Sequence, residues 1–131
     1  MIDEVIEFFQ SFERYQDKSK ELLNFHLEPS FSLNQYKIFK DKEITGFLNW
    51  AYLDDVCKFK FVHHGIIDYG NWKSGDNLCF IHLVCRKNLK DMINWAKKHF
   101  GTDMQYNKEV VWLRINKDID KVMRINNKWV R

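Results

Sequence analysis

The sequence has few of the residues that interrupt regular structure or cross-link a fold. Its 131 residues include one proline, five glycines and three cysteines. So few prolines and glycines argue against a flexible linker or a low-complexity tract. An odd number of cysteines in apolar surroundings predicts reduced, mostly buried thiols, as in a cytosolic protein. The chain is long enough to form a hydrophobic core without disulfides or a structural metal, so we expect one domain over residues 1–131.

Long apolar runs and a strong charge of one sign are also absent. No stretch approaches the roughly 20 apolar residues of a membrane-spanning helix. Asp3 and Glu4 stand where a signal peptide would carry positive charge, so we expect a cytoplasmic protein without a signal peptide or a membrane span. The formal net charge of +3 is too small to indicate nucleic-acid binding by itself. Aromatic residues, in contrast, make up 16% of the chain, which predicts rings packed in a core or lining a groove.

The first third of the chain has the apolar spacing of helices. We expect one helix from Ile2 to about Tyr15 and a second helical piece from Lys18 to Phe25. Pro29 disfavours helical angles at Glu28, so the second helix should end about there.

The rest of the chain alternates strands with one strong helix. A helix from Asn88 to about Phe100 should end at Gly101. Leu53 to Phe61 fits either a short helix or a strand. The expected strands are Gln35–Phe39, Ile44–Tyr52, Leu78–Val84, Val110–Ile115 and Val122–Val130, the last bent near residues 126–127. This order predicts an α+β fold with a mostly antiparallel mixed sheet flanked by helices.

Two histidines are the candidates for proton transfer, because imidazole titrates near neutral pH. His26 precedes the proline at the expected helix end, where it is either a base or simply an exposed histidine. His82 interrupts an apolar strand, and strand alternation places it on the same face as Phe80 and Val84. The alternative for His82 is a core histidine with a satisfied hydrogen bond.

Other chemical signals are weaker. The polar turn Trp72-Lys-Ser74-Gly75-Asp76 either only starts the strand or offers its backbone N–H groups to an oxyanion or carbonyl. The pairs His63-His64 and His82-x-x-Cys85 lack the four matched ligands of a zinc site, so we expect no metal. No Gly-rich phosphate loop or nucleophile elbow is present.

The turn and the strand after it resemble a known family. Trp72-x-Ser74-Gly75-Asp76, followed by Phe80-Ile81, is similar to the central motif of the toxin-activating lysine acyltransferases of the hemolysin-C type. Weaker colinear resemblances are Asn34-Gln35-Tyr36, Trp50-Ala51-x-Leu53, the helix end Lys97–Phe100 and the hairpin Lys121–Trp129. Together they cover about residues 20 to 131.

The resemblance implies a GNAT-type acyltransferase that takes a fatty acyl group from acyl carrier protein rather than from coenzyme A. The acceptor would be a lysine of a protein substrate such as a toxin, and no cofactor would be tightly bound. The family's catalytic histidine falls on His26, and the position of its catalytic aspartate falls on His82. The residues expected to bind substrate are Trp50, Trp72, Ser74, Gly75, Asp76 and Phe80.

Two other functions stay open at this point. The histidine at the aspartate position favours a weakened or inactive GNAT-like protein that acts by binding or as a structural protein, including one of a phage or mobile element. A nucleic-acid-binding module would rest only on the basic charge and the aromatics. The expected partners are acyl carrier protein and the protein substrate, with a homodimer left open.

Overall fold

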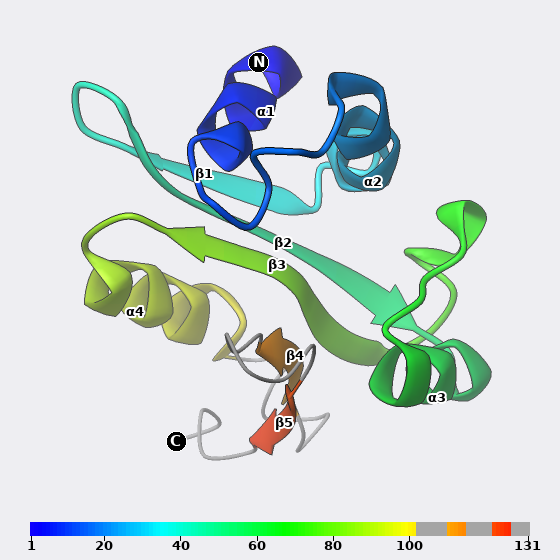
Figure 1. The fold of residues 1–131 in the computed structure, drawn as a ribbon. Coiled ribbons are helices and arrows are strands. Elements are labelled where there is room, and N and C mark those ends of the chain that lie inside the picture. The colour runs from blue at the N-terminus through cyan, green and yellow to red at the C-terminus, as the bar shows by residue number, and fades with distance from the viewer. Residues whose placement is uncertain (102–109, 115–121, 127–131) are drawn as a thin grey trace.

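The computed structural model describes residues 1–101, 110–114 and 122–126, and Figure 1 shows how its elements are arranged. Their order along the chain is α1 (Ile2–Gln10), α2 (Lys20–Ser32), β1 (Tyr36–Lys40), β2 (Ile44–Leu53), α3 (Asp55–His64), the short 3-10 helix η1 (Tyr69–Asn71), β3 (Asn77–Cys85), α4 (Leu89–His99), β4 (Val110–Arg114) and β5 (Val122–Asn126).

The strands form one sheet in the order β1-β2-β3-β4-β5. Neighbouring strands are antiparallel except for β3 and β4, which run parallel and pair at Cys79 with Val111 and at Phe80 with Trp112. The expected α+β fold with a mostly antiparallel mixed sheet is therefore confirmed. The expected bend and end of the last strand lie outside the described residues.

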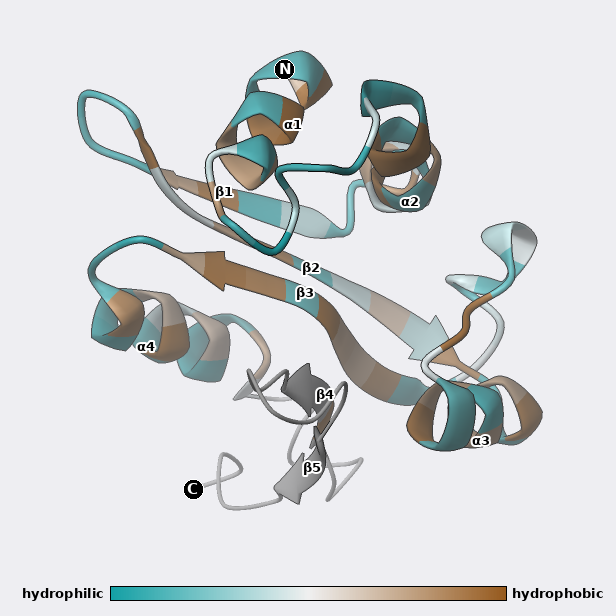
Figure 2. Ribbon diagram, viewed as in Figure 1, coloured by the Kyte–Doolittle hydropathy of each residue, from teal (hydrophilic) through white to brown (hydrophobic). Residues whose placement is uncertain are grey.

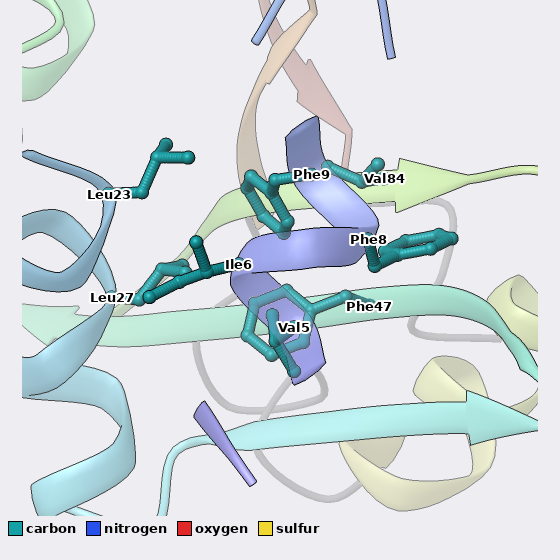
Figure 3. Close-up of a cluster of buried hydrophobic side chains, with 8 residues drawn as sticks. All are labelled: Val5, Ile6, Phe8, Phe9, Leu23, Leu27, Phe47 and Val84. Atoms are coloured by element: carbon teal, nitrogen blue, oxygen red, sulfur yellow. The ribbon is translucent and has the colours of Figure 1, made fainter. Parts of the chain in front are cut away.

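Helices cover both faces of this sheet (Figure 1). On one face, α1 and α2 pack against β2 and β3 through a cluster of eight apolar side chains, which Figure 3 shows: Val5, Ile6, Phe8, Phe9, Leu23, Leu27, Phe47 and Val84. On the other face, Met92 and Ala96 of α4 and Phe100, the residue after the helix, pack on Leu48, Trp50, Leu78 and Phe80. Alternate residues of β2 thus point to opposite layers, as the period of two in a strand requires.

The alternation of β3 is interrupted at Ile81. Asn49 pairs with His82 and Trp50 pairs with Phe80, so Ile81 has no partner residue on β2. Such a bulge reverses the phase of a strand and turns the following side chains to the other face. Phe80 accordingly packs under α4, whereas His82 lies near the α1–α2 layer with Val84. The prediction that His82 shares a face with Phe80 is wrong for this reason. Figure 2 shows β3 as a mostly hydrophobic strand with a short hydrophilic interruption.

The second helix does not end before the proline. α2 continues through Pro29 to Ser32, and the buried side chains of Leu27, Pro29 and Ser30 hold its second half against the sheet. A proline inside a helix removes a hydrogen bond to the carbonyl four residues earlier, here that of Phe25. Phe25, the residue that carries this carbonyl, is more than half exposed. His26 therefore lies in the body of a helix and not at its end.

The first helix is shorter than expected. α1 ends at Gln10, where the hydroxyl of Ser11 donates a hydrogen bond to the carbonyl of Phe8 at 2.6 Å. Such side-chain hydrogen bonds compete with the helical ladder. The chain then continues to Lys18 through tight turns.

The ambiguous stretch after β2 is a helix. The carboxylate of Asp54 accepts a hydrogen bond from the backbone N–H of Cys57 at 2.7 Å and caps the start of α3. Of the three cysteines, Cys79 is buried, Cys57 and Cys85 are half-buried, and all are free thiols. Within the described ranges, no helix is long and apolar enough to cross a membrane.

Gly75 is required by a close approach of two backbone segments. A Cβ atom at this position would lie 2.5 Å from the Asp54 Cα atom, whereas a Cβ atom on Gly70 would meet nothing within 4 Å. We expect Gly75→Ala to lower the free energy of unfolding by about 2 kcal/mol or more, because backbone must move to make room. Gly70→Ala is the matched control, with a change within about 0.5 kcal/mol. Urea unfolding of both variants measures the difference, and equal stabilities would contradict the steric explanation.

Candidate active site

His82 lies half-buried on β3, directly after the bulge, between the sheet and α1. Its ring meets the ring of Phe9 edge to face, with centroids 5.8 Å apart. Its backbone N–H donates a hydrogen bond to the side-chain oxygen Oδ1 of Asn49 at 2.8 Å, and its ring nitrogen Nδ1 lies 3.2 Å from the same oxygen. One side chain of β2 therefore holds both the backbone and the ring of His82.

Asn49 is itself held by α2. Its Nδ2 group donates to the Ser30 hydroxyl oxygen at 3.0 Å, and the Ser30 hydroxyl donates to the carbonyl of Leu27 at 2.8 Å. Both Asn49 and Ser30 are fully buried, at 0% exposure. A buried polar side chain is stable only when it is hydrogen-bonded, and here each group has its partner. The series Leu27 carbonyl, Ser30, Asn49 and His82, which we call the relay, links α2 to β3.

His26 lies on α2 one turn before Ser30, so the two side chains are on the same side of the helix. The imidazole of His26 is exposed and contacts the ring of Phe25, with centroids 5.8 Å apart. An exposed imidazole can exchange protons with a substrate without first being uncovered. The helix thus places one accessible histidine beside the relay that holds the other.

Burial lowers the pKa of His82 to about 4, and the positive charges of His26 and Arg14 act in the same direction. His82 is therefore neutral at pH 7. Of the two histidines that the sequence singled out, His26 is exposed on α2 and His82 is half-buried on β3, and the charge of His26 contributes to the lowered pKa of His82.

The polar turn before β3 is fastened to the end of β2. The backbone N–H groups of Ser74 and Gly75 both donate to the carbonyl of Tyr52, at 2.8 and 3.0 Å, and the Ser74 hydroxyl oxygen accepts the N–H of Asp54 at 3.0 Å. These amides already have acceptors within the fold. These hydrogen bonds give the turn a structural role as the connection to β3. An oxyanion could bind to the two amides only by displacing the Tyr52 carbonyl.

The aromatic candidates are core residues. Trp50 and Phe80 are buried on the α4 face, opposite the face of His82, and Trp72 is buried against α3 and the end of β2. Asp76 is exposed in the turn. The structure therefore does not bring Trp50 and Phe80 to the histidine pair.

Two surface recesses lie away from the histidines. One, of about 490 Å³, runs along α3 and is lined by Asp55, Val56, Phe59, Lys60 and His64. The other, of about 720 Å³, lies between α1 and the β1–β2 hairpin, and Glu7, Phe8, Lys40 and Arg86 are among its lining residues. In the part of the chain that the structure describes, no three His, Cys, Asp or Glu side chains are grouped so that they could hold a metal ion.

Sequence reasoning missed Asn49 and Ser30. Within the stretch Phe47–Ala51 of β2, Asn49 is the only polar residue, and its neighbours on both sides are apolar or aromatic. A buried amide in such a run needs partners, and that was the available signal. The signal for Ser30 was weaker. It lies four residues after His26, but the helix was expected to end before it.

These observations define the class of protein: a small α+β domain with an exposed histidine on its helical layer and a half-buried, neutral histidine on its sheet. The chain belongs to the HlyC family of RTX toxin acyltransferases, whose family model matches residues 1–129. The relationship thus begins at the first residue and not near residue 20. The chain is also similar to an uncharacterized protein of Synechocystis sp., with 30% identity over 105 residues that cover 76% of this chain and 69% of the relative. Family membership indicates acyltransferase activity on a toxin-like protein substrate.

The lowered pKa of His82 makes stability depend on pH. In the unfolded chain a histidine has a pKa near 6.5, so protonation between pH 6.5 and 4 favours the unfolded state. The stability that neutral His82 maintains is complete above pH 6.5 and is lost as the pH falls towards 4. His26 and Arg14, the positive groups facing it, add to this effect.

We expect the wild-type protein to lose roughly 2 kcal/mol more unfolding free energy between pH 7 and pH 4 than the variant His82→Gln does, allowing for partial exposure of the ring. Urea unfolding of both proteins at several pH values measures the difference, and all other titrating groups cancel in the comparison. Parallel pH profiles would show that His82 titrates normally in the folded state.

Proposed function

We propose that this protein transfers a fatty acyl group from acyl carrier protein to a lysine side chain of a protein substrate, with His26 as the general base. The proposal is supported by an exposed imidazole on α2, one turn before Ser30, and by a neutral imidazole on β3 that is held through Asn49 and that same Ser30. The family match supports acyl transfer as the reaction and a toxin-like protein as the substrate.

The chemistry requires a base. A lysine side chain has a pKa near 10.4, so at neutral pH it is an ammonium ion that cannot attack a thioester. In the proposed reaction His26 first accepts a proton from the ammonium ion and releases it to solvent, which leaves a neutral amine. The amine nitrogen then forms a bond to the acyl carbon while the carbon–sulfur bond breaks. His26 takes the second proton from the nitrogen and passes it to the departing thiolate of the carrier, so the products are the amide, the carrier thiol and one proton in solvent.

His82 has a supporting role in this proposal. A neutral imidazole can accept a hydrogen bond from His26 and hold that ring in one tautomer. It cannot stabilise the imidazolium form of His26 as a carboxylate would. The resemblance places an aspartate at this position, so we expect a slower reaction than with a carboxylate there.

The proposed substrate contacts divide by exposure. Ser74 and Asp76 are exposed on the turn, and the neighbouring Gly75 and Trp72 shape that surface from beneath. Trp50 and Phe80 are buried, so they would affect the site only indirectly, by packing the sheet against α4. The excess of 21 basic over 18 acidic residues suits an acidic partner such as acyl carrier protein. The reaction would take place in the cytoplasm, where the three free thiols stay reduced.

A second candidate is a protein that keeps the fold and binds a partner without acyl transfer. The neutral His82 at the aspartate position favours this function, because it weakens the support for a protonated base. The two candidates differ in one observable: only the enzyme changes the mass of a lysine-containing partner.

We expect the purified protein, supplied with acyl-loaded acyl carrier protein and a candidate toxin-like substrate, to add an acyl group to a lysine. His26→Ala should reduce the rate by about 100-fold or more, since a general base contributes 10²–10⁴. His63→Ala is the matched control, because His63 is an exposed histidine that stacks on Phe59 at the end of α3. Mass spectrometry of the substrate follows the reaction, and full activity of His26→Ala would exclude the base role.

A further inference from the structure

We propose that Asn49, braced by Ser30, fixes His82 in the tautomer that carries its proton on Nδ1, so that Nε2 offers a lone pair to the site. Asn49 and Ser30 are then positioning residues. The catalytic meaning of this arrangement rests on the proposed function, whereas the tautomer itself does not.

The backbone N–H of His82 sets the orientation of the Asn49 amide. This group can only donate, and it lies 2.8 Å from the side-chain atom of Asn49. The atom that faces it must therefore be the oxygen, because the amide nitrogen is itself a donor. The main-chain donor thus decides between the two possible orientations of the side-chain amide.

Ser30 confirms the same orientation from the other end. With Oδ1 facing His82, the Nδ2 group of Asn49 faces the Ser30 oxygen at 3.0 Å and needs an acceptor there. The single hydroxyl hydrogen of Ser30 is directed to the Leu27 carbonyl at 2.8 Å, which leaves the serine oxygen free to accept. The hydrogen bonds from Asn49 to Ser30 and from Ser30 to Leu27 thus run in one direction.

The ring of His82 completes the relay. Its Nδ1 atom lies 3.2 Å from Oδ1 of Asn49, an oxygen that can only accept. Nδ1 must then carry the hydrogen, since a lone pair there would face a lone pair. In a neutral imidazole one nitrogen is a donor and the other an acceptor, so Nε2 is the acceptor. Burial keeps the ring neutral at pH 7 and so preserves this asymmetry.

The arrangement is chemically that of a histidine oriented by an amide. Orientation of a catalytic histidine by an asparagine is known from the Cys-His-Asn arrangement of papain-like proteases. In this protein the oriented Nε2 atom can accept a hydrogen bond from a donor group in the site and cannot give one. The relay therefore determines which hydrogen-bonding role His82 offers to the site.

The tautomer can be measured directly in the whole protein. Two-bond ¹H–¹⁵N correlation spectra of the ¹⁵N-histidine-labelled chain at pH 7 distinguish the two neutral tautomers, and the spectrum of His82→Gln identifies the His82 signals. We expect His82 to show a protonated Nδ1 and an unprotonated Nε2. A protonated Nε2, or an equal mixture of the two forms, would overturn the proposal whether or not the protein proves to be an acyltransferase.

Two variants of Asn49 separate positioning from packing. Asn49→Asp keeps an acceptor next to Nδ1, so we expect the Nδ1–H form to persist and the pKa of His82 to rise by at least one unit, because a carboxylate favours the imidazolium. Asn49→Leu removes the acceptor, and we expect the preference for Nδ1–H to be lost. Ser30→Ala should give a smaller loss. Thr45→Val is the control, because Thr45 is buried on the same strand and hydrogen-bonded outside the relay.

If acyl transfer is found, the kinetics of the Asn49 variants provide a second, independent test of the positioning role. Asn49→Leu is expected to lower kcat at least tenfold with little change in KM, and Asn49→Asp to restore most of that loss. Should Asn49→Leu fail to fold, the wild-type spectrum and Asn49→Asp still decide the question. An unchanged His82 pKa in Asn49→Asp, with the ring still in place, would contradict the relay. A correct tautomer without acyl transfer would reject the proposed function alone.

Discussion

The hydrogen bond from the backbone N–H of His82 to the side chain of Asn49 is the interaction on which the site depends. At the bulge, Ile81 has no partner on β2, and the ladder needs a substitute acceptor for the following residue. The amide oxygen of Asn49 supplies it. Without that oxygen a main-chain donor next to a buried layer would stay unpaired, which costs more than the hydrogen bond itself contributes. The same oxygen also contacts Nδ1 of the ring, so one atom both completes the backbone hydrogen bonding of β3 and orients the His82 side chain.

The second constraint is the length of α2. Because the helix continues through Pro29, His26 and Ser30 stand one turn apart on a single rigid element. Had the helix ended at Glu28, Ser30 would lie in a loop, and its contact with Asn49 would not fix the distance from His26 to the sheet. The burial of Leu27 and Ser30 against the sheet compensates for the hydrogen bond that the proline removes.

The elements of the fold and the two candidate histidines could be predicted from the sequence, but the side chains that hold His82 in place could not. Periodicity identified β2, β3 and α4 because their apolar residues repeat over many positions. Periodicity gave the wrong face for His82, because Ile81 has no partner on β2 and this bulge turns the next side chain to the other face of the sheet. The alternation of residues in the sequence cannot reveal a bulge. The rule that helices end before proline failed at Glu28 because tertiary burial outweighed a local preference. The role of Asn49 depends on partners that lie 19 and 33 residues away in sequence.

The chemistry of the relay bears on why a histidine occupies the position where the resemblance places an aspartate. The oxygen of Asn49 is fixed towards this position by a main-chain N–H, so the side chain at residue 82 meets an acceptor. A carboxylate there would place negative oxygen against oxygen in a half-buried setting, which is unfavourable. An imidazole can donate to that oxygen and still offer an acceptor on its far side. The hydrogen-bonding groups of histidine at residue 82 and asparagine at residue 49 therefore complement each other.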